Sequence, residues 1–216
     1  MIKALLLSCL MWLCPAVVIA QEAPLERVDI DLADRSALQD GARTFVSYCM
    51  GCHGAKFQRY ERVADDLGLS HDQMLKELVF TGAKIGDPMA SSLRASDGKH
   101  WFGAAPPDLT LVARVRGNDW LYGYLRGFYP DATRPWGVNN HVLHDVGMPN
   151  VLEPLQVRMP PAQFDAKVKN LVTFLAYSAD PVKLQSQRIG IYVLSYLLVL
   201  LGFAFLLKRE YWKDVR

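Results

Sequence analysis

Cys49-Met50-Gly51-Cys52-His53 is the stretch that decides how this 216-residue chain folds. Two cysteines separated by two residues and followed directly by a histidine form the C-x-x-C-H pattern to which a c-type haem is attached. The two thiols form thioether bonds with the porphyrin vinyl groups, and the adjacent imidazole then lies beneath the iron. The pattern predicts one covalently bound haem c held by Cys49 and Cys52, with His53 as the proximal iron ligand.

A C-x-x-C pair also occurs in thioredoxin-like redox sites and as half of a zinc site. Zinc needs a second Cys or His pair at ligand spacing, and a thioredoxin-like site needs a βαβ setting; the sequence predicts neither. Cys9 and Cys14 complete the cysteines of the chain, and both lie in a segment that we expect to be removed. The mature chain would therefore keep no pair for a structural disulfide.

The first twenty residues have the pattern of a secretory signal. Lys3 precedes an apolar run over residues 4–13, and Val18-Ile19-Ala20 provides a small-residue cleavage site before the polar Gln21-Glu22. An uncleaved membrane anchor is the alternative, although the apolar core is short for a span. Export fits haem attachment, which in bacteria takes place on the periplasmic side. We expect residues 1–20 to be a signal peptide.

An apolar run near the other end predicts a membrane anchor. Residues 189–207 are nineteen residues without a charge, and at about 1.5 Å rise per residue they match a hydrocarbon core of ~30 Å. We therefore expect an anchor helix over residues 188–208 in the bacterial inner membrane. Basic residues follow the uncharged run, which places a tail of residues 209–216 in the cytoplasm and the preceding domain in the periplasm. These basic residues are Lys208, Arg209, Lys213 and Arg216.

Residues 21–187 remain for a single haem domain. They contain 18 Lys and Arg against 20 Asp and Glu, a net charge of −2 before the haem propionates are added. This balance argues against nucleic-acid binding and mildly favours basic partners. The length exceeds what a minimal one-haem domain needs, so the extra residues are expected to form loop insertions that cover the haem or meet a partner.

Two helical patterns frame the domain. Apolar residues recur at helical spacing from Asp34, a plausible N-cap, to Tyr48, and again over residues 162–178. We expect these helices to cross closely at Gly41, with Phe45 meeting Leu171 or Leu175.

Shorter helices are predicted over residues 72–81 and 118–127, the second capped by Asn118 or Asp119 and ended by Gly127. Loops are expected over residues 82–107 and 130–161. Strand signals are few, so the predicted class is mainly α.

The sixth iron ligand is open on spacing alone. Met89, Met148 and Met159 all lie in expected loops beside prolines; Met148 lies in Gly147-Met148-Pro149, and Met159 precedes Pro160-Pro161 and the final helix. The two serious candidates are Met148 and Met159. A thioether ligand would raise the reduction potential relative to a second imidazole. Met50 lies inside the attachment loop, and Met74 is expected in the core. The histidines that would supply a second imidazole are expected at the surface: His71, His100, His141 and His144.

The ordered set of motifs resembles the cytochrome c1 family over most of the mature chain. The matching elements are Phe45-x-x-Tyr48 with the C-x-x-C-H motif, Phe57-x-x-Tyr60, Ala105-Pro106-Pro107-Asp108-Leu109-Thr110, Arg114-x-Arg116, Gly147-Met148-Pro149 and the C-terminal span with its basic tail. The resemblance implies a class I-like cytochrome c domain with loop insertions and one C-terminal transmembrane helix.

The resemblance also implies site residues. It makes Met148 the sixth ligand and places Pro107 and Arg116 beside the haem, with the Arg116 guanidinium near a propionate. Trp120 corresponds to an aromatic residue near the haem, and Trp101 is a weaker candidate for the same role. The stretches between the motifs are shorter here than in longer members of the family. The resemblance therefore does not assign the surface that docks a partner.

The function implied by the resemblance is a one-electron relay inside a quinol–cytochrome c oxidoreductase of a respiratory or photosynthetic chain. An electron would come from the Rieske iron–sulfur protein and leave to a soluble or membrane-bound cytochrome c, with cytochrome b as a further partner. The chain would need no catalytic site of its own. One alternative is an autonomous membrane-tethered cytochrome that donates to a terminal oxidase, and another is a haem peroxidase or gas sensor with an open sixth position.

Overall fold

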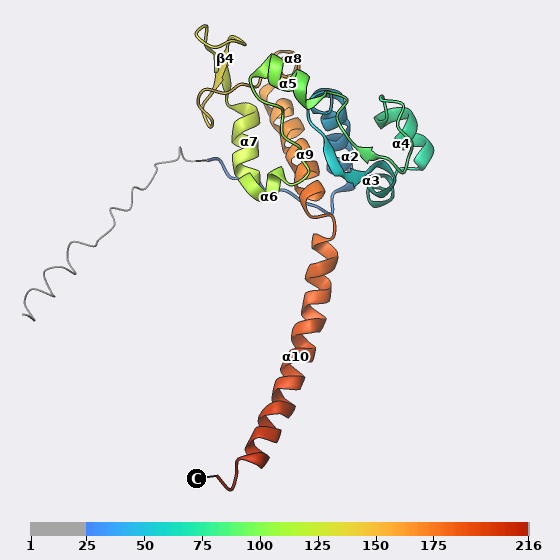
Figure 1. Cartoon of the computed structure of the whole chain (residues 1–216), viewed down its shortest axis with the longest axis vertical. Helices are drawn as coiled ribbons and strands as arrows, with labels where there is room; N and C mark the ends of the chain where they lie inside the picture. Colours follow the sequence, from blue (N-terminus) through green and yellow to red (C-terminus); the bar gives the residue numbers. More distant parts are fainter. Residues whose placement is uncertain (1–24, 216) are drawn as a thin grey trace, which may run out of the picture.

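Helices dominate the computed structural model, which describes residues 25–215. Figure 1 shows most of them gathered in one domain, from which α10 leaves as a single long rod. The helices are α2 (Arg35–Thr44), α3 (Tyr60–Leu67), α4 (His71–Leu78), α5 (Ala95–Phe102), α6 (Val112–Arg116), α7 (Asn118–Arg126), α8 (Glu153–Arg158), α9 (Pro161–Ala179) and α10 (Lys183–Tyr211). The strands β1 (Ala55–Arg59) and β2 (Pro88–Met89) form one antiparallel pair, and β3 (Phe128–Pro130) and β4 (Val138–Asn140) form another.

The core is organised around the crossing of α2 and α9, the two helices predicted to frame the domain. A Cβ atom added at Gly41 would lie 2.1 Å from the backbone oxygen of Asn170, so a larger side chain has no room there. One turn after Gly41, directly beyond the end of α2, the Phe45 ring packs beside Phe174 with centroids 5.6 Å apart, and both side chains are fully buried. The close crossing at Gly41 is confirmed, and the ring that meets Phe45 belongs to Phe174.

Two of the helix starts are fixed by side-chain caps. The Asp34 carboxylate accepts hydrogen bonds from the backbone N–H groups of Ser36 and Ala37, which confirms the predicted N-cap of α2. Ser70 caps α4 in a reciprocal capping box with Gln73. The predicted helix over residues 72–81 is therefore present, but it starts at position 71 and ends at position 78 because Val79 has extended backbone dihedrals.

The predicted cap of α7 is wrong. Gly117, at φ 88°, occupies the N-cap position and offers no side chain. The carboxylate of Asp119 instead accepts the backbone N–H of Val28 at 2.8 Å, because the segment before α2 lies against this end of the helix. The predicted end at Gly127 is confirmed.

The two long segments predicted as loops contain short regular elements. Residues 82–107 include β2 and α5, and residues 130–161 include β4 and α8. In the second sheet Phe128 pairs with Asn140 and Pro130 with Val138. These elements span two to eight residues, which is too short for a periodic apolar pattern to be visible in the sequence.

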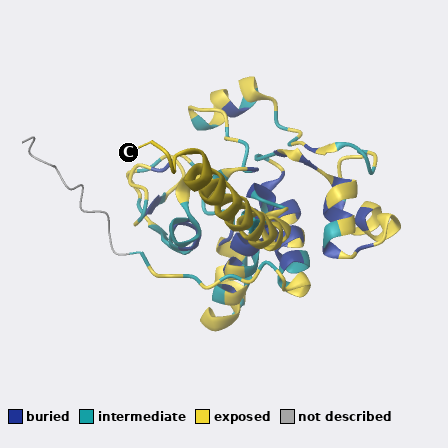
Figure 2. Cartoon of the chain, turned by 90° about the horizontal axis from the view of Figure 1, so that it is seen from below, coloured by how far each residue is buried: buried dark blue, intermediate teal, exposed yellow. Residues whose placement is uncertain are grey.

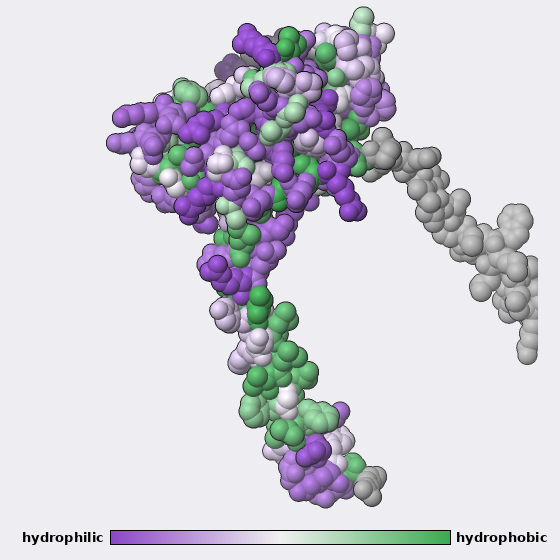
Figure 3. Space-filling model, turned by 180° about the vertical axis from the view of Figure 1, so that it is seen from behind, coloured by the Kyte–Doolittle hydropathy of each residue, from purple (hydrophilic) through white to green (hydrophobic). Residues whose placement is uncertain are grey.

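The last helix has the length and composition of a membrane span. α10 contains 29 residues, or about 43 Å at 1.5 Å per residue, and its most apolar window has a mean hydropathy of 2.4 with nothing buried. Figure 2 shows it exposed along its length, and Figure 3 shows an apolar band between polar ends. Among residues 25–215 it is the one helix that fits a span, consistent with a single-pass anchor. The predicted signal over residues 1–20 lies outside the described part of the chain.

Candidate haem site

The attachment motif lies where the first core helix ends. After Thr44, α2 continues as a π-helical turn over Phe45–Cys49, a wider turn that is frequent at functional sites. The backbone N–H groups of Cys52 and His53 both donate to the Cys49 carbonyl, at 3.0 and 2.8 Å. The chain therefore folds back on itself within one turn, and this turn carries two free thiols, one buried on Cys49 and one half-buried on Cys52.

The imidazole of His53 is held in the form that an iron ligand requires. Its Nδ1 lies 2.7 Å from the backbone oxygen of Pro107. A carbonyl oxygen only accepts, so Nδ1 carries the proton and Nε2 keeps its lone pair. Burial lowers the pKa of His53 and outweighs the opposing effect of this hydrogen bond, which favours the neutral ring. Two free thiols and a neutral imidazole with an available Nε2 fit the attachment of a c-type haem.

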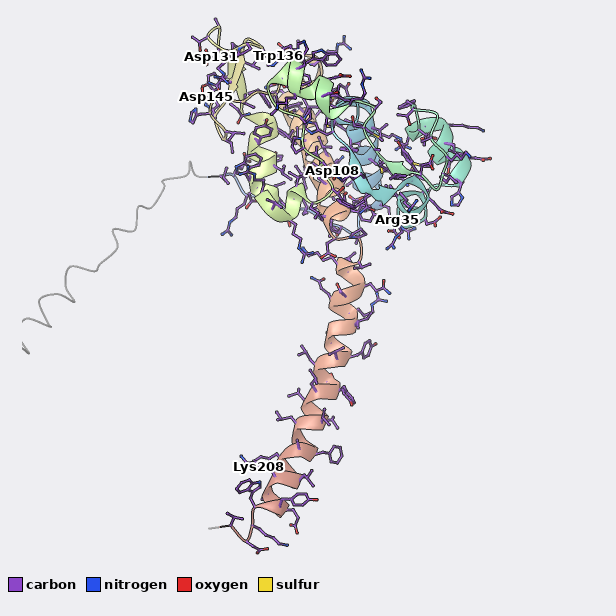
Figure 4. The ribbon with its side chains drawn as sticks, in the orientation of Figure 1. Arg35, Asp108, Asp131, Trp136, Asp145 and Lys208 are labelled. Atoms are coloured by element: carbon purple, nitrogen blue, oxygen red, sulfur yellow. The ribbon has the colours of Figure 1, made fainter. Side chains whose placement is uncertain are left out.

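The segment that carries Pro107 is bonded tightly to the attachment loop. The Asp108 carboxylate accepts the backbone N–H groups of Lys56 at 2.8 Å and Thr110 at 3.0 Å, and the N–H of Leu109 donates to the Gly54 carbonyl at 2.7 Å. Figure 4 shows Asp108 in the middle of the domain. The carbonyl that orients His53 is therefore part of a rigid support. Asp108 was visible in the sequence only as part of the Pro-Pro-Asp-Leu motif, without a role.

A second group of predicted residues meets along α7. The Arg116 guanidinium lies 5.0 Å above the Trp120 ring, and Trp120 stacks on Tyr124 with centroids 4.9 Å apart and planes inclined by 8°. The Tyr124 hydroxyl lies 3.5 Å from the sulfur of Met148. The structure thus brings Arg116, Trp120 and Met148 together through Tyr124, a residue that was not predicted from the sequence. Its position four residues after Trp120, on the same face of the predicted helix, was the signal that was available.

The loop that precedes Met148 is held by the β3–β4 hairpin. The Arg134 guanidinium donates to the Asp145 carboxylate at 3.0 Å and to the backbone oxygens of Asp145 and Val146 at 2.6 and 3.3 Å. Asp145 has φ 60°, and its N–H donates to the Asn139 side chain at 3.0 Å. Figure 4 shows Asp131, Trp136 and Asp145 at this end of the domain. These hydrogen bonds hold the loop as far as Val146, two residues before the predicted ligand.

The other methionines, histidines and the tryptophan considered for the site have different surroundings. Met74 is fully buried in the core, as expected, whereas Met159 is half-buried where α8 ends. Trp101, on α5, is 59% exposed and meets the edge of Phe102. All four histidines outside the attachment motif are exposed, and two have neighbours: His71 lies 3.0 Å from Asp65, and His141 stacks on Tyr129.

The domain is mainly helical, and its first core helix leads into two thiols and a neutral imidazole. An apolar helix follows at the C-terminus. These features are those of a membrane-anchored c-type cytochrome. Residues 81–215 match the sequence model of the Cytochrome C1 family. The chain is 40% identical to cytochrome c1 of Allochromatium vinosum, with 99% of both chains covered. It is 27% identical to cytochrome c1 of Rhodospirillum rubrum, covering 85% of this chain and 83% of that one. The chain belongs to the cytochrome c1 family, electron-transport proteins with a covalently attached haem c.

A further relative carries a different name. The chain is 41% identical to a protein of Nitrosomonas europaea called ammonia monooxygenase gamma subunit, with 100% of this chain and 99% of that one covered. The family match favours cytochrome c1 over that name. The family resemblance, the mainly α class and the covalent haem c predicted from the sequence are therefore confirmed.

Proposed function

We propose that this chain relays single electrons through a haem that Cys49 and Cys52 would bind covalently and whose iron His53 and Met148 would ligate. When bound, the haem supplies a reversible one-electron iron couple. The protein itself has to bind the haem, orient it and exclude water from it. The observation that carries the proposal is the 2.7 Å contact between His53 Nδ1 and the Pro107 carbonyl, because it leaves Nε2 free to bind a metal.

The remaining residues of the predicted site support the same proposal. Pro107 orients the proximal histidine through its backbone oxygen and would line the haem. Arg116 is exposed and keeps a guanidinium free of any carboxylate in the contacts described, so it is available to offset the charge of a haem propionate. Trp120 is half-buried between Arg116 and Tyr124, in the same layer as Met148, and would present an aromatic surface to the porphyrin.

The partners follow from the family. Cytochrome c1 is a subunit of the cytochrome bc1 complex, so we assign cytochrome b as the membrane neighbour, the Rieske iron–sulfur protein as electron donor and a cytochrome c as acceptor. The basic residues in the last turn of α10 and beyond it favour a cytoplasmic C-terminus, with the haem domain on the periplasmic side of the bacterial inner membrane. The anchor fits an autonomous tethered carrier equally well, so the two assignments need a separate measurement.

The test of the ligand assignment compares Met148→Leu with Met159→Leu. Each full-length protein is purified with its haem from its native membranes in mild detergent. We expect Met148→Leu to lower the reduction potential and to let the reduced haem bind carbon monoxide, because leucine removes the sulfur and leaves a position open. Met159→Leu should leave both properties unchanged. The reverse result would make Met159 the ligand, and no effect from either variant would refute ligation by either of these two methionines.

The same preparation of the unmutated protein tests the assembly. Reduced-minus-oxidised spectra report whether b-type haems accompany the c-type haem, and a subunit analysis reports an iron–sulfur protein. Co-purification of both supports the bc1 subunit. Recovery of the chain alone with a single c-type haem would instead establish the tethered carrier.

A further inference from the structure

The side chain of Tyr124 ends at the sulfur of Met148. Its Oη lies 3.5 Å from Sδ, within the longer range over which a hydroxyl donates to a large sulfur atom. Tyr124 is only 9% exposed, so few water molecules compete for this hydroxyl. A buried tyrosine hydroxyl normally finds a hydrogen-bond partner, and the thioether fills that role here.

Packing fixes the position of the hydroxyl. Trp120 stacks on one face of the Tyr124 ring, with planes inclined by 8° and centroids 4.9 Å apart, and Phe128 meets the ring at 65° and 5.4 Å. The Asn140 amide donates to the backbone oxygen of Tyr124 at 2.7 Å, which ties α7 to the hairpin. Since Asn140 also accepts the N–H of Val142, one asparagine links Tyr124 to the start of the loop that carries Met148.

The electronic consequence follows from the two lone pairs of a thioether sulfur. When one lone pair binds iron, the other remains available to accept the Tyr124 proton. Donation of a hydrogen bond withdraws electron density from the sulfur, which makes it a weaker donor to ferric iron. Hydrogen bonds of this kind to ligand atoms are one of the means by which a protein tunes a metal site.

We infer that Tyr124 is a positioning residue that raises the reduction potential by donating its hydroxyl proton to the Met148 sulfur. The inference rests on the proposed assignment of Met148 as the sixth ligand. It predicts that loss of the hydroxyl favours the oxidised form while the sulfur stays bound to iron. The hydrogen bond adds to the iron–sulfur bond and does not replace it, so only the balance between the two oxidation states shifts.

The test removes only the hydroxyl, in Tyr124→Phe, with Tyr122→Phe as the matched control. Tyr122 lies on the same helix and is similarly buried, but its ring faces Arg126 at 4.6 Å. The full-length proteins with haem are titrated in detergent, and the near-infrared charge-transfer band of sulfur-bound ferric haem is recorded. At a fixed ambient potential we expect Tyr124→Phe to raise the ratio of oxidised to reduced protein about threefold. This corresponds to a reduction potential lower by about 28 mV, at 59 mV per tenfold change. The charge-transfer band should be retained. Tyr122→Phe should leave the ratio unchanged.

Three results would overturn the inference, and they are distinguishable. If Tyr124→Phe leaves the potential unchanged while Met148→Leu lowers it, the ligand assignment stands and the tuning role alone fails. If Tyr124→Phe abolishes the charge-transfer band, the tyrosine holds the methionine in place and does not tune it. If Met148→Leu itself has no effect on potential or band, the ligand assignment fails and the inference falls with it.

Discussion

Replacing Gly41 by alanine should destabilise the haem domain strongly, although alanine is the better helix former. The added Cβ would lie 2.1 Å from the backbone oxygen of Asn170 and 2.8 Å from the Cβ of Phe174. A backbone oxygen cannot rotate away as a side chain can. The two helices must therefore separate by more than 1 Å at the crossing before the contact reaches the 3.4 Å of an ordinary van der Waals distance.

The magnitude follows from what that separation disrupts. A gap of 0.5–1 Å forfeits about a quarter to a half of the dispersion energy across a contact, and the affected contact includes the buried Phe45–Phe174 pair. Overpacked cores typically lose about 1–3 kcal/mol, and this backbone clash belongs near the upper end. Alanine recovers about 1 kcal/mol of helix propensity relative to glycine. We therefore expect a net loss of about 2 kcal/mol, or about 4–8 °C in melting temperature for a domain of this size.

Thermal unfolding of the full-length protein with haem, followed by circular dichroism in detergent, measures this loss. Gly86→Ala is the control, because a Cβ at Gly86 meets nothing within 4 Å and its backbone is not left-handed. Both variants make the same chemical change, but only Gly41 lies inside a helix, so their difference contains the crossing together with the helix-propensity gain of alanine. A melting temperature for Gly41→Ala equal to or above that of Gly86→Ala would refute the net loss expected from the backbone contact between α2 and α9.

Two other predictions concern the loop that precedes Met148 and the contact between α9 and α3. Arg134→Gln should loosen the loop held through Asp145 and allow partial carbon monoxide binding to the reduced haem, whereas Arg94→Gln, which breaks an exposed surface pair, should not. Complete exclusion of carbon monoxide by Arg134→Gln would contradict the role of Arg134 in holding this loop. Burial and the hydrogen bond to Asp66 raise the pKa of Tyr177 above its usual 10.0, so its contribution to stability is complete below pH 10 and is lost as the pH rises further. Tyr177→Phe should lower the melting temperature at about pH 8 and flatten its decline at about pH 11, and equal pH dependence in both proteins would contradict this.

The parts of the fold that the sequence predicts are those with strong local signals. The apolar periodicity of α9 and the Asp34 cap of α2 are local, and both are present in the structure. Gly41 was a prediction about distant contacts, yet it succeeded because a glycine costs helix stability and is tolerated inside a helix mainly where another backbone approaches closely. The cap of α7 failed because the Asp119 carboxylate bonds a residue 91 positions away, which no local pattern contains.

The candidate site shows the same difference between local patterns, which could be predicted, and distant contacts, which could not. The attachment motif is a contiguous pattern, so Cys49, Cys52 and His53 could be predicted as one unit. Their support depends on distant contacts, since the Pro107 carbonyl lies 54 residues from the imidazole that it orients. The sixth ligand could not be chosen between Met148 and Met159 by spacing, because both lie beside prolines in long segments. The structure adds that the Met148 sulfur lies 3.5 Å from the Tyr124 hydroxyl, whereas Met159 lies half-buried where α8 ends.

The two sides of the site have separate supports, and this separation has a functional consequence. The histidine side rests on α2 and on the bonds between the attachment loop and Asp108. The methionine side rests on α7 and on the hairpin that holds the Met148 loop through Arg134. Damage to the hairpin should therefore leave the covalent attachment of the haem intact while it opens the sixth position. With Met148 as the sixth ligand, such a division would let changes on the methionine side adjust the reduction potential without endangering haem retention. For the same reason we expect that the Tyr124 variant can be compared with the unmutated protein in a fully haem-loaded form.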